Sequence, residues 1–598
     1  MSLLSSHIQT SAAEVVKDLF EVEITPETLP VQDTRKDFEG DLTIVVFPLT
    51  KFKLGAPPQI AEKLGSALVE RLESVTAYNV VKGFLNLSIG DAYWQSFVAE
   101  QQNDPDFFAT NLGEGQTVVV EYCSPNTNKP LHLGHLRNIV LGYSLTQILQ
   151  ANGFNAIPTC LFNDRGTNIS KSMHAYLSSE NKETPDSSSR KGDKIVGDYY
   201  VKFAGMIEEE SKLIMATEGI SKDEAAKKAP SQLAINEMTI RWEEGDAEIR
   251  ALWEQMNAWV YAAYEDTFQR LGISFDRYFY ESEVYKRGKE TVQEGLEKGA
   301  FYHTEDGSVE VDLTAEGMDR KTLLRSNGTS LYITQDLAIA EDKYNEYKMD
   351  RSIYVVGNEQ DYHFQVLFKV LAKLEKPYAQ GLYHMSYGMV DLPSGKMKSR
   401  EGTTVEIDDL LTELESKARE ETLKNLDKLQ DMEEAELNAL FQKLGTGAVK
   451  YFLAKVDPKK RMMFDPKESV SLKGNTGPYI QYAYARIQSI RRNADHIGPY
   501  SADLNLEEPL LEAERTLIQV ISRYKDVLRE AGENYNPALL ANYAYELTKE
   551  FNRFYRDAPI LKSSNPHTSS FRLALASFAG ETLKNCMALL GIQMPERM

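Results

Sequence analysis

A short apolar strand, a polar loop and an amphipathic helix together constrain the fold of this chain most. Residues 117–122 read TVVVEY, a β-branched run typical of a buried strand in a parallel sheet. After the loop, apolar residues recur at helical spacing, at Leu136, Ile139, Val140, Tyr143 and Leu149. Later strand-like segments alternate with helical runs; they are AIPTCLF, SVEVDL, SLYIT, SIYVVG and YHMSYGMVDL. This alternation predicts a multidomain α/β fold built on a doubly wound, Rossmann-like parallel sheet, with ligands at the carboxyl ends of its strands.

The length of 598 residues is too great for one core, so we expect several domains. Residues 1–110 predict a small α+β domain, with helices over 11–20 and from Pro57 and a strand or hairpin at YNVVKGFLNLSI. The sheet domain is expected over 115–405, with a helical insertion at about 180–265. Helical patterning then predicts a connection over 406–470 and an all-α domain over 471–598.

Composition excludes several classes of protein. No run reaches the roughly 18 apolar residues of a membrane span, and the N-terminus lacks the pattern of a signal or transit peptide, so we expect a cytoplasmic protein. The three cysteines form no CxxC, so neither a disulfide framework nor a structural zinc site is expected. The net charge of −22 weakens a nucleic-acid hypothesis without excluding it, because basic residues cluster at 455–462 and 485–492.

The loop before the helix carries the most suggestive chemistry. His132 and His135 bracket Gly134 at the helix start, where unpaired N–H groups and the helix dipole favour an anion. Gly134 lets a flat base approach the backbone, and Lys129 adds a cation. These features suit a nucleoside triphosphate attacked at its α-phosphate. The histidines could instead be capping residues or metal ligands, although HExxH and an obvious third ligand are absent.

A second basic segment, KMKSR, places Lys396, Lys398 and Arg400 within five residues of a glycine-flanked loop. Alone it would suggest a solvated charge run, but with the upstream histidine pair it indicates a phosphate clamp. No GxxxxGK[ST] occurs, and the GEG at 113–115 precedes the strand and lacks a third glycine. The chain is therefore neither a P-loop protein nor a typical dinucleotide binder.

HLGH and KMKSR resemble the HIGH and KMSKS motifs of class I aminoacyl-tRNA synthetases. Five further segments resemble the arginyl-tRNA synthetase family in order and spacing: EYCSPNTNKPLHLGH, SLYITQDLA, VVGNEQDYHFQ, KGNTGPYIQYAYARIQSI and LLGIQMPERM. The resemblance covers about 115–598, and the first 110 residues match the family more loosely.

The resemblance implies a ligase that activates L-arginine with ATP and transfers it to the 3′ end of tRNA(Arg). His132, His135 and Gly134 would bind ATP, supplied with Mg²⁺ as the substrate complex, and Lys396 would follow the departing pyrophosphate. Ser399 stands where the second lysine of KMSKS belongs. Lys129, Lys398 and Arg400 are open alternatives for the missing cation.

The family's amino-acid positions map onto acidic, amide and hydroxyl side chains. An arginine side chain is a planar cation with five N–H donors, so acids and fixed acceptors suit it and would repel a glutamate substrate. The expected arginine-binding residues are Glu121, Ser124, Asn126, Tyr332, Asp336 and Gln360.

The last domain resembles the family's anticodon-binding domain, where Tyr479, Tyr482 and Met598 match residues that contact anticodon bases. By resemblance the N-terminal domain would contact the tRNA elbow, and we expect a monomer with no membrane partner. Three alternatives compete: a synthetase for glutamate, glutamine or lysine, a small-molecule nucleotidyltransferase, and a non-catalytic tRNA-binding paralogue. The pocket chemistry, the C-terminal helical domain and the retention of His132, His135 and Lys396 argue against them in turn.

Overall fold

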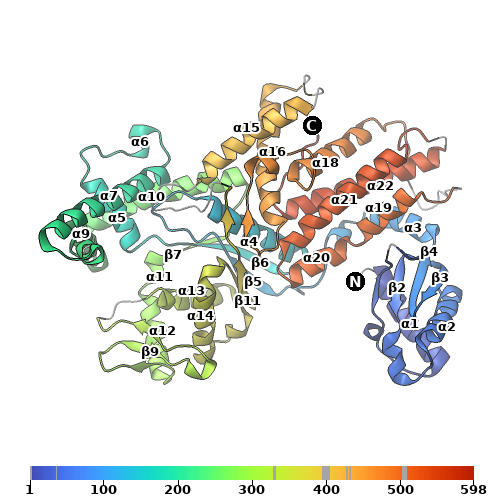
Figure 1. Ribbon diagram of the computed structural model, residues 1–598, viewed down its shortest axis with the longest axis horizontal. Coiled ribbons are helices and arrows are strands. Elements are labelled where there is room, and N and C mark those ends of the chain that lie inside the picture. The colour runs from blue at the N-terminus through green and yellow to red at the C-terminus, as the bar shows by residue number, and fades with distance from the viewer. Residues whose placement is uncertain are drawn as a thin grey trace.

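The computed structural model describes residues 3–35, 37–327, 331–393, 405–425, 429, 432–500, 508–563 and 565–598. Figure 1 shows an elongated molecule with a central sheet, a helical arm on one side and a helical bundle on the other. The N-terminal domain lies beyond the bundle, so the sheet occupies the middle of the molecule. Among the described residues, no helix combines the length and the apolar character needed to cross a membrane.

The N-terminal domain packs two helices on a four-stranded antiparallel sheet in the order β1-β2-β4-β3. Its elements are α1 (Leu3–Phe20), β1 (Val31–Asp33), β2 (Leu42–Val45), α2 (Pro57–Arg71), β3 (Val75–Val81) and β4 (Phe84–Ile89). The predicted helix from Pro57 and the predicted hairpin are confirmed. The first helix begins earlier than the expected residue 11, because Leu4 and Ile8 continue the buried face of Ala12 and Val15.

Five parallel strands form the central sheet in the order β12-β11-β5-β6-β7. They are β5 (Thr117–Glu121), β6 (Asn155–Phe162), β7 (Arg277–Tyr280), β11 (Arg351–Gly357) and β12 (Leu382–Tyr387). The predicted doubly wound parallel sheet is confirmed. From β5 the chain winds outward to β6 and β7 and later returns to the other side of β5 with β11. The strand order therefore reverses between β5 and β11, where ligands bind in open α/β sheets.

Helix α4 (Leu133–Ala151) connects β5 to β6 and packs closely against the sheet. A Cβ added to Gly142 would lie 2.2 Å from Cγ of the buried Tyr122, so only glycine permits this approach. The expected strand–loop–helix unit at 117–151 is thus confirmed, and it directs the N-terminus of α4 toward the carboxyl end of β5.

Two of the predicted strands do not belong to the parallel sheet. SVEVDL contributes β9 (Val309–Val311) to a separate antiparallel sheet with β8 (Tyr302–His303) and β10 (Lys321–Leu324). The described part of SLYIT begins helix α13 (Tyr332–Tyr347), so its prediction as a strand is wrong. Ile333, Leu337 and Ala340 are buried at helical spacing, and this periodicity outweighs the short β-branched run.

The helical insertion joins β6 to β7. It comprises α5 (Thr167–Leu177), α6 (Pro185–Ser188), α7 (Gly192–Glu218), α8 (Lys222–Lys228), α9 (Pro230–Glu244) and α10 (Ala247–Leu271). Three helices accompany the later part of the sheet domain: α11 (Glu281–Val284), α12 (Arg287–Glu297) and α14 (Asp361–Lys373). The insertion projects as the arm at the left of Figure 1.

The C-terminal third is almost entirely helical. It contains α15 (Ile407–Asn425), α16 (Glu434–Ala454), α17 (Pro466–Ser469), α18 (Gly477–Arg492), α19 (Glu512–Ser522), α20 (Tyr524–Glu533), α21 (Pro537–Asp557) and α22 (Pro566–Leu589). One short parallel pair, β13 (Val390–Asp391) with β14 (Met462–Met463), ties these helices to the strand region after β12. Helix α3 (Asp91–Gln101) packs on α19 and α22 and so connects the N-terminal domain to the bundle.

Candidate active site

The HLGH segment forms the N-terminus of α4. His132 is the N-cap residue, and its Nδ1 accepts a hydrogen bond from the Gly134 backbone N–H at 3.1 Å. His135 Nδ1 accepts one from the His132 N–H at 3.2 Å. The two rings lie side by side, with centroids 3.9 Å apart. The capping alternative is therefore correct as a description of the local structure, and it fixes both rings at the helix end.

The electrostatics of this helix end favour neutral histidines. Burial, reinforced by the charge of Lys129, lowers the pKa of His132 to about 4. Burial and the neighbouring His132 hold the pKa of His135 well below its usual value. Because Nδ1 of each neutral ring accepts a backbone hydrogen bond, the proton resides on Nε2. Each imidazole can therefore donate from Nε2 to a phosphate oxygen.

The KMKSR residues Lys396 and Lys398 lie outside the described residues, but both described flanks of their segment meet α4. Leu133 N donates to Val405 O at 3.0 Å, and Ile407 N donates to Leu131 O at 2.9 Å. On the other flank, the buried guanidinium of Arg137 donates to the carbonyls of Gly388 and Met389. The described residues on both sides of this segment therefore lie beside the HLGH helix.

The loop between β5 and α4 has an unusual backbone. Cys123 and Ser124 both have positive φ, at 74° and 28°, in a region that residues other than glycine rarely adopt. Hydrogen bonds from neighbouring elements hold this conformation. Asn163 Nδ2 donates to Ser124 O at 3.1 Å, and the Tyr264 hydroxyl donates to the carbonyls of Asn126 and Lys129. Strain of this kind concentrates at ligand sites, where the surrounding structure enforces it.

Glu121 ends β5 and is only 6% exposed. Its Oε2 lies 2.5 Å from Nζ of Lys343, a residue of α13 with no exposed surface. Neither atom has a hydrogen-bond partner among the described residues, so the contact is an ion pair without a well-directed hydrogen bond. Ser124 Oγ donates to Glu121 Oε1 at 3.4 Å. The sequence reasoning missed Lys343, which neutralises the carboxylate that it had assigned to arginine.

Asp336 is more exposed than Glu121. On the first turns of α13, its Oδ2 lies 2.6 Å from Nε2 of His363 in α14. Gln360 immediately precedes α14 and is exposed. Tyr332 begins α13 but is 72% exposed, and no described contact joins its hydroxyl to the other expected arginine-binding residues.

A further carboxylate, Glu281, lies at the carboxyl end of β7. The sequence analysis did not include it among the candidate site residues. Burial raises its pKa to about 7; Arg165 opposes this shift, while Asp164 and Asp336 add to it. Glu281 lies in α11, which packs against α13, and its carboxylate accepts a hydrogen bond from Gln335, the neighbour of Asp336. The signal available in the sequence was the position of this acid directly after RYFY, a strand that the sequence analysis did not assign.

The residues expected to read the anticodon lie in the C-terminal helical domain. Tyr479 and Tyr482 are half-buried on α18. The hydroxyl of Tyr479 accepts a hydrogen bond from Asn552 Nδ2 at 3.0 Å. Arg486 lies against the rings of both Tyr482 and Tyr555, at 4.8 and 5.0 Å from their centroids. Met598 is partly buried against the main core.

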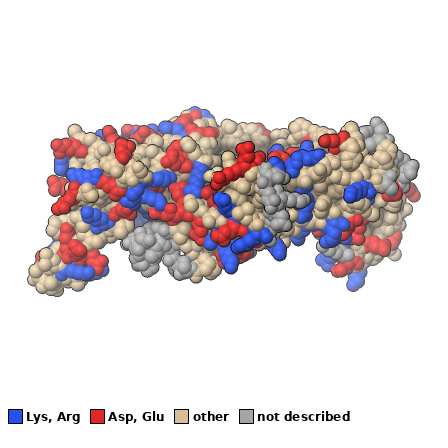
Figure 2. All heavy atoms as spheres, turned by 90° about the horizontal axis from the view of Figure 1, so that it is seen from above, with Lys and Arg blue, Asp and Glu red and all other residues tan. Residues whose placement is uncertain are grey.

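Within the described part of the chain, no group of three or more His, Cys, Asp or Glu residues could hold a metal ion. Figure 2 shows basic and acidic residues intermixed over the face drawn there. On this face, the strongly negative net charge of the chain therefore leaves room for local contacts to an anionic partner.

Comparisons with known proteins agree with this arrangement. The family model for the catalytic domain of class I tRNA synthetases (R) matches residues 100–465, and that for the DALR anticodon binding domain matches residues 480–598. The arginine–tRNA ligase of Bacteroides thetaiotaomicron is 47% identical, and that of Flavobacterium psychrophilum is 45% identical. Both alignments cover 100% of this chain and of the relative.

Solved structures show the same fold. The arginyl-tRNA synthetase of Thermus thermophilus matches with a TM-score of 0.78 at 24% identity, and that of Plasmodium falciparum with 0.77 at 20%. Each comparison covers both chains completely. The family models and the full-length relatives show that the chain belongs to the arginine–tRNA ligase family of the class I tRNA synthetases.

Proposed function

We propose that this protein activates L-arginine with ATP and transfers the arginyl group to the 3′ end of tRNA(Arg). The observation that carries the proposal is the helix N-terminus that presents two neutral histidines at the end of β5, together with acids at the ends of β5 (Glu121) and β7 (Glu281) and on α13 (Asp336). Lys343 pairs with Glu121, Arg165 offsets part of the charge of Glu281, and Asp336 keeps a partly exposed carboxylate beside His363. Such a site suits a cationic side chain.

In the first step, a carboxylate oxygen of arginine attacks the α-phosphorus of ATP. The bond from this phosphorus to the bridging oxygen breaks, and pyrophosphate leaves with the electron pair. Positioning and charge stabilisation do most of the catalytic work in such a displacement. His132 and His135 would donate from Nε2 to the phosphate oxygens, with Gly134 beside the nucleoside. An added Cβ at Gly134 would also lie 3.0 Å from Cε1 of His132, so the glycine makes room for the capping ring.

Lys396 is proposed to follow the departing pyrophosphate, with Mg²⁺ arriving as part of the ATP substrate. Lys129 stands just before HLGH, and burial lowers its pKa. We propose it as the cation that compensates for Ser399, with Lys398 as the alternative. In the second step, a terminal ribose hydroxyl attacks the carbonyl carbon of the adenylate. The carbon–oxygen bond to AMP breaks, AMP leaves with the electron pair, and the hydroxyl proton is lost.

The guanidinium of arginine is proposed to bind Asp336 and Glu281, with Tyr332 and Gln360 closing over it when the substrate is present. Glu121 ends β5, and Ser124 and Asn126 lie in the strained loop that follows it. These three residues would hold the rest of the amino acid. Tyr479, Tyr482 and Met598 remain our candidates for anticodon contacts. A monomeric state and a cytoplasmic location stay predictions.

The decisive experiment is amino-acid-dependent exchange of pyrophosphate into ATP, measured with and without tRNA. Arginine should be the only amino acid that supports exchange, and the family resemblance predicts a requirement for tRNA. Transfer of labelled arginine to tRNA(Arg) tests the second step. Exchange with glutamate or lysine but not with arginine would overturn the proposal.

A further inference from the structure

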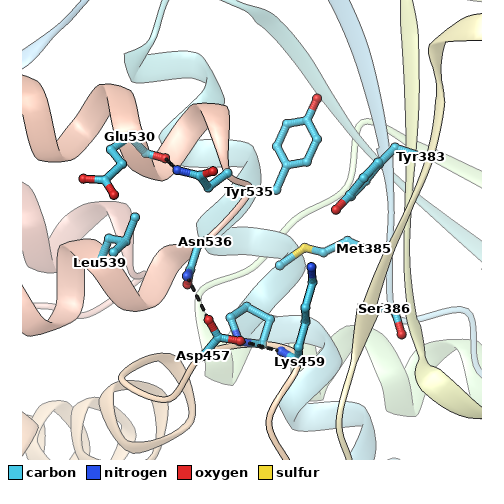
Figure 3. Close-up of a pocket in the computed structure, with 11 residues that line it drawn as sticks. Tyr383, Met385, Ser386, Asp457, Lys459, Glu530, Tyr535, Asn536 and Leu539 are labelled. Atoms are coloured by element: carbon cyan, nitrogen blue, oxygen red, sulfur yellow. Dashed lines mark hydrogen bonds between the residues drawn. The ribbon is translucent and has the colours of Figure 1, made fainter. Parts of the chain in front are cut away.

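A pocket of about 370 Å³ lies outside the candidate active site, where the edge of the central sheet meets the C-terminal helices. Its walls come from β12, from residues 457–459, and from the turn between α20 and α21. Figure 3 shows Tyr383, Met385 and Lys459 converging beside Tyr535. The volume falls within the range of pockets that hold small ligands or ligand fragments.

Tyr535, in the wall of this pocket, has a backbone conformation that is unfavourable for a tyrosine. Its φ is 50°, in the left-handed region, where glycine normally follows a helix and a bulky side chain is strained. The ring centroid lies 4.8 Å from that of Tyr383, and the hydroxyl accepts a hydrogen bond from Arg351 Nη1 at 3.1 Å. The fold thus retains an aromatic ring where glycine would suit the chain better, which points to a use for the ring.

The polar groups of the pocket include one available cation. Lys459 is exposed, and its ammonium has no ion-pair partner among the described residues. Asp457 is engaged, because its carboxylate accepts from Asn536 Nδ2 at 3.2 Å and from the Lys459 backbone N–H at 3.0 Å. The Glu530 carboxylate points away from the tyrosine rings in Figure 3. Two aromatic rings beside a single cation match the base and the phosphate of one nucleotide.

The pocket is also connected to the candidate active site. Ser386, at its floor on β12, donates from Oγ to Asp361 Oδ1 at 2.6 Å, and Asp361 follows Gln360. On its other side, the pocket contacts α20 and α21 of the domain that carries Tyr479 and Tyr482. A tRNA that reaches both the active site and the anticodon-binding residues has to pass between these two regions.

We propose that this pocket binds one unpaired nucleotide of the tRNA, with the base against Tyr383 and Tyr535 and the phosphate near Lys459. The inference rests on the proposed tRNA substrate and adds a contact between its two ends. An unpaired nucleotide is required because a paired base cannot turn its face to the tyrosines.

The test compares tRNA binding by wild type, Tyr535→Gly and Lys459→Ala, measured by filter binding over a range of salt concentrations. Tyr535→Gly relieves the backbone strain but removes the ring, and it should raise the Kd for tRNA roughly tenfold. Lys459→Ala should make the plot of log K against log salt less steep by about one unit, which corresponds to the loss of one phosphate contact. Lys459 is exposed and makes no described side-chain contact, so this variant should fold normally.

Glu375→Gly provides a matched control. Like Tyr535, Glu375 has a positive φ, which is 55° here, but it is exposed and does not line the pocket. It should bind tRNA as wild type does. Chemical footprinting of the tRNA should show that Tyr535→Gly exposes one or two nucleotides and leaves the other protections intact. Unchanged Kd, salt slope and footprint in both pocket variants, with wild type still charging tRNA(Arg), would overturn the pocket while the proposed function stands. Failure of wild type to charge tRNA would overturn both.

Discussion

Lys343 Nζ and Glu121 Oε2 are 2.5 Å apart in the interior beneath the candidate arginine site. The lysine also lies 4.1 Å from the centroid of the Tyr354 ring, so its charge is enclosed by a carboxylate and an aromatic face. A lysine without exposed surface is rarely tolerated unless it is paired. The pair therefore fixes the direction of the Glu121 carboxylate at the end of β5.

Breaking this pair should destabilise the protein. Lys343→Met leaves a buried carboxylate without its counterion, and the loss of a partner from a buried pair costs about 3–5 kcal/mol. The double variant Lys343→Met with Glu121→Gln should recover much of this loss, because the remaining charge is removed. Thermal unfolding followed by circular dichroism measures both effects. Lys348→Met, at an exposed position on the same segment, is the control. Equal destabilisation by the single and double variants would contradict the pairing argument.

Arginine affinity should depend more on Asp336 than on Glu121. Asp336 has a partly exposed carboxylate, whereas Lys343 already neutralises Glu121. Asp336→Asn should raise the KM for arginine by about 10- to 100-fold, as expected for the loss of a charge-assisted hydrogen bond. Glu121→Gln should raise it less, and both should leave the KM for ATP nearly unchanged. Pyrophosphate exchange with tRNA present gives both constants. Equal effects on arginine and ATP would remove these residues from the arginine pocket.

The KM for arginine should rise as the pH falls below neutrality. Burial raises the pKa of Glu281 to about 7, so this carboxylate is ionised above pH 7 and protonated below it. Protonation removes a negative charge that favours the guanidinium. The KM should therefore increase by up to about tenfold for each pH unit below 7. Glu281→Gln should have a high KM that no longer changes between pH 6 and 8. A wild-type KM that is flat over this range would show that Glu281 does not bind the substrate.

The histidines of HLGH should remain neutral throughout the physiological range. His132 has a pKa lowered to about 4, so between pH 6.5 and 4 the unfolded chain binds a proton that the folded protein does not. Folding stability should therefore decrease as the pH falls through this window, by about 3 kcal/mol. Urea unfolding at several pH values should show a weaker pH dependence in His132→Gln. An ATP KM with an inflection near pH 6.5 that is lost in His132→Gln would contradict the neutral state.

Tyr482 should contribute to tRNA affinity through its aromatic ring. The guanidinium of Arg486 lies against this ring and against that of Tyr555. Tyr482→Ala should raise the KM for tRNA roughly fivefold, since aromatic contacts to unpaired bases contribute about 1 kcal/mol or more. The KM for arginine should not change. Tyr484→Phe is a matched control on the same helix, because the buried Tyr484 hydroxyl bonds to Glu596 within the protein. If Tyr484→Phe raised the KM for tRNA more than Tyr482→Ala does, Tyr482 would not be the residue that contacts the tRNA bases.

Local patterns in the sequence determined much of this protein. TVVVEY, the periodic helix after it and HLGH together predicted a parallel sheet with a nucleotide site at the start of α4, and family motifs specified arginine and tRNA. These features were predictable because strand burial, helical period and helix-end chemistry depend on residues close together in the chain. Where two local signals conflicted, as in SLYIT, the helical burial of Ile333, Leu337 and Ala340 decided the outcome.

Only the tertiary structure decided which charges meet. Lys343 and Glu121 are separated by more than two hundred residues, and a lysine in a helix gives no local sign that it will be buried against a strand end. The same is true of Asp336 with His363 and of Tyr535 with Tyr383. Each of these pairs depends on how helices pack on the sheet and on the C-terminal domain. The sequence thus determined the type of site, while packing determined which carboxylates remain available to a cationic substrate.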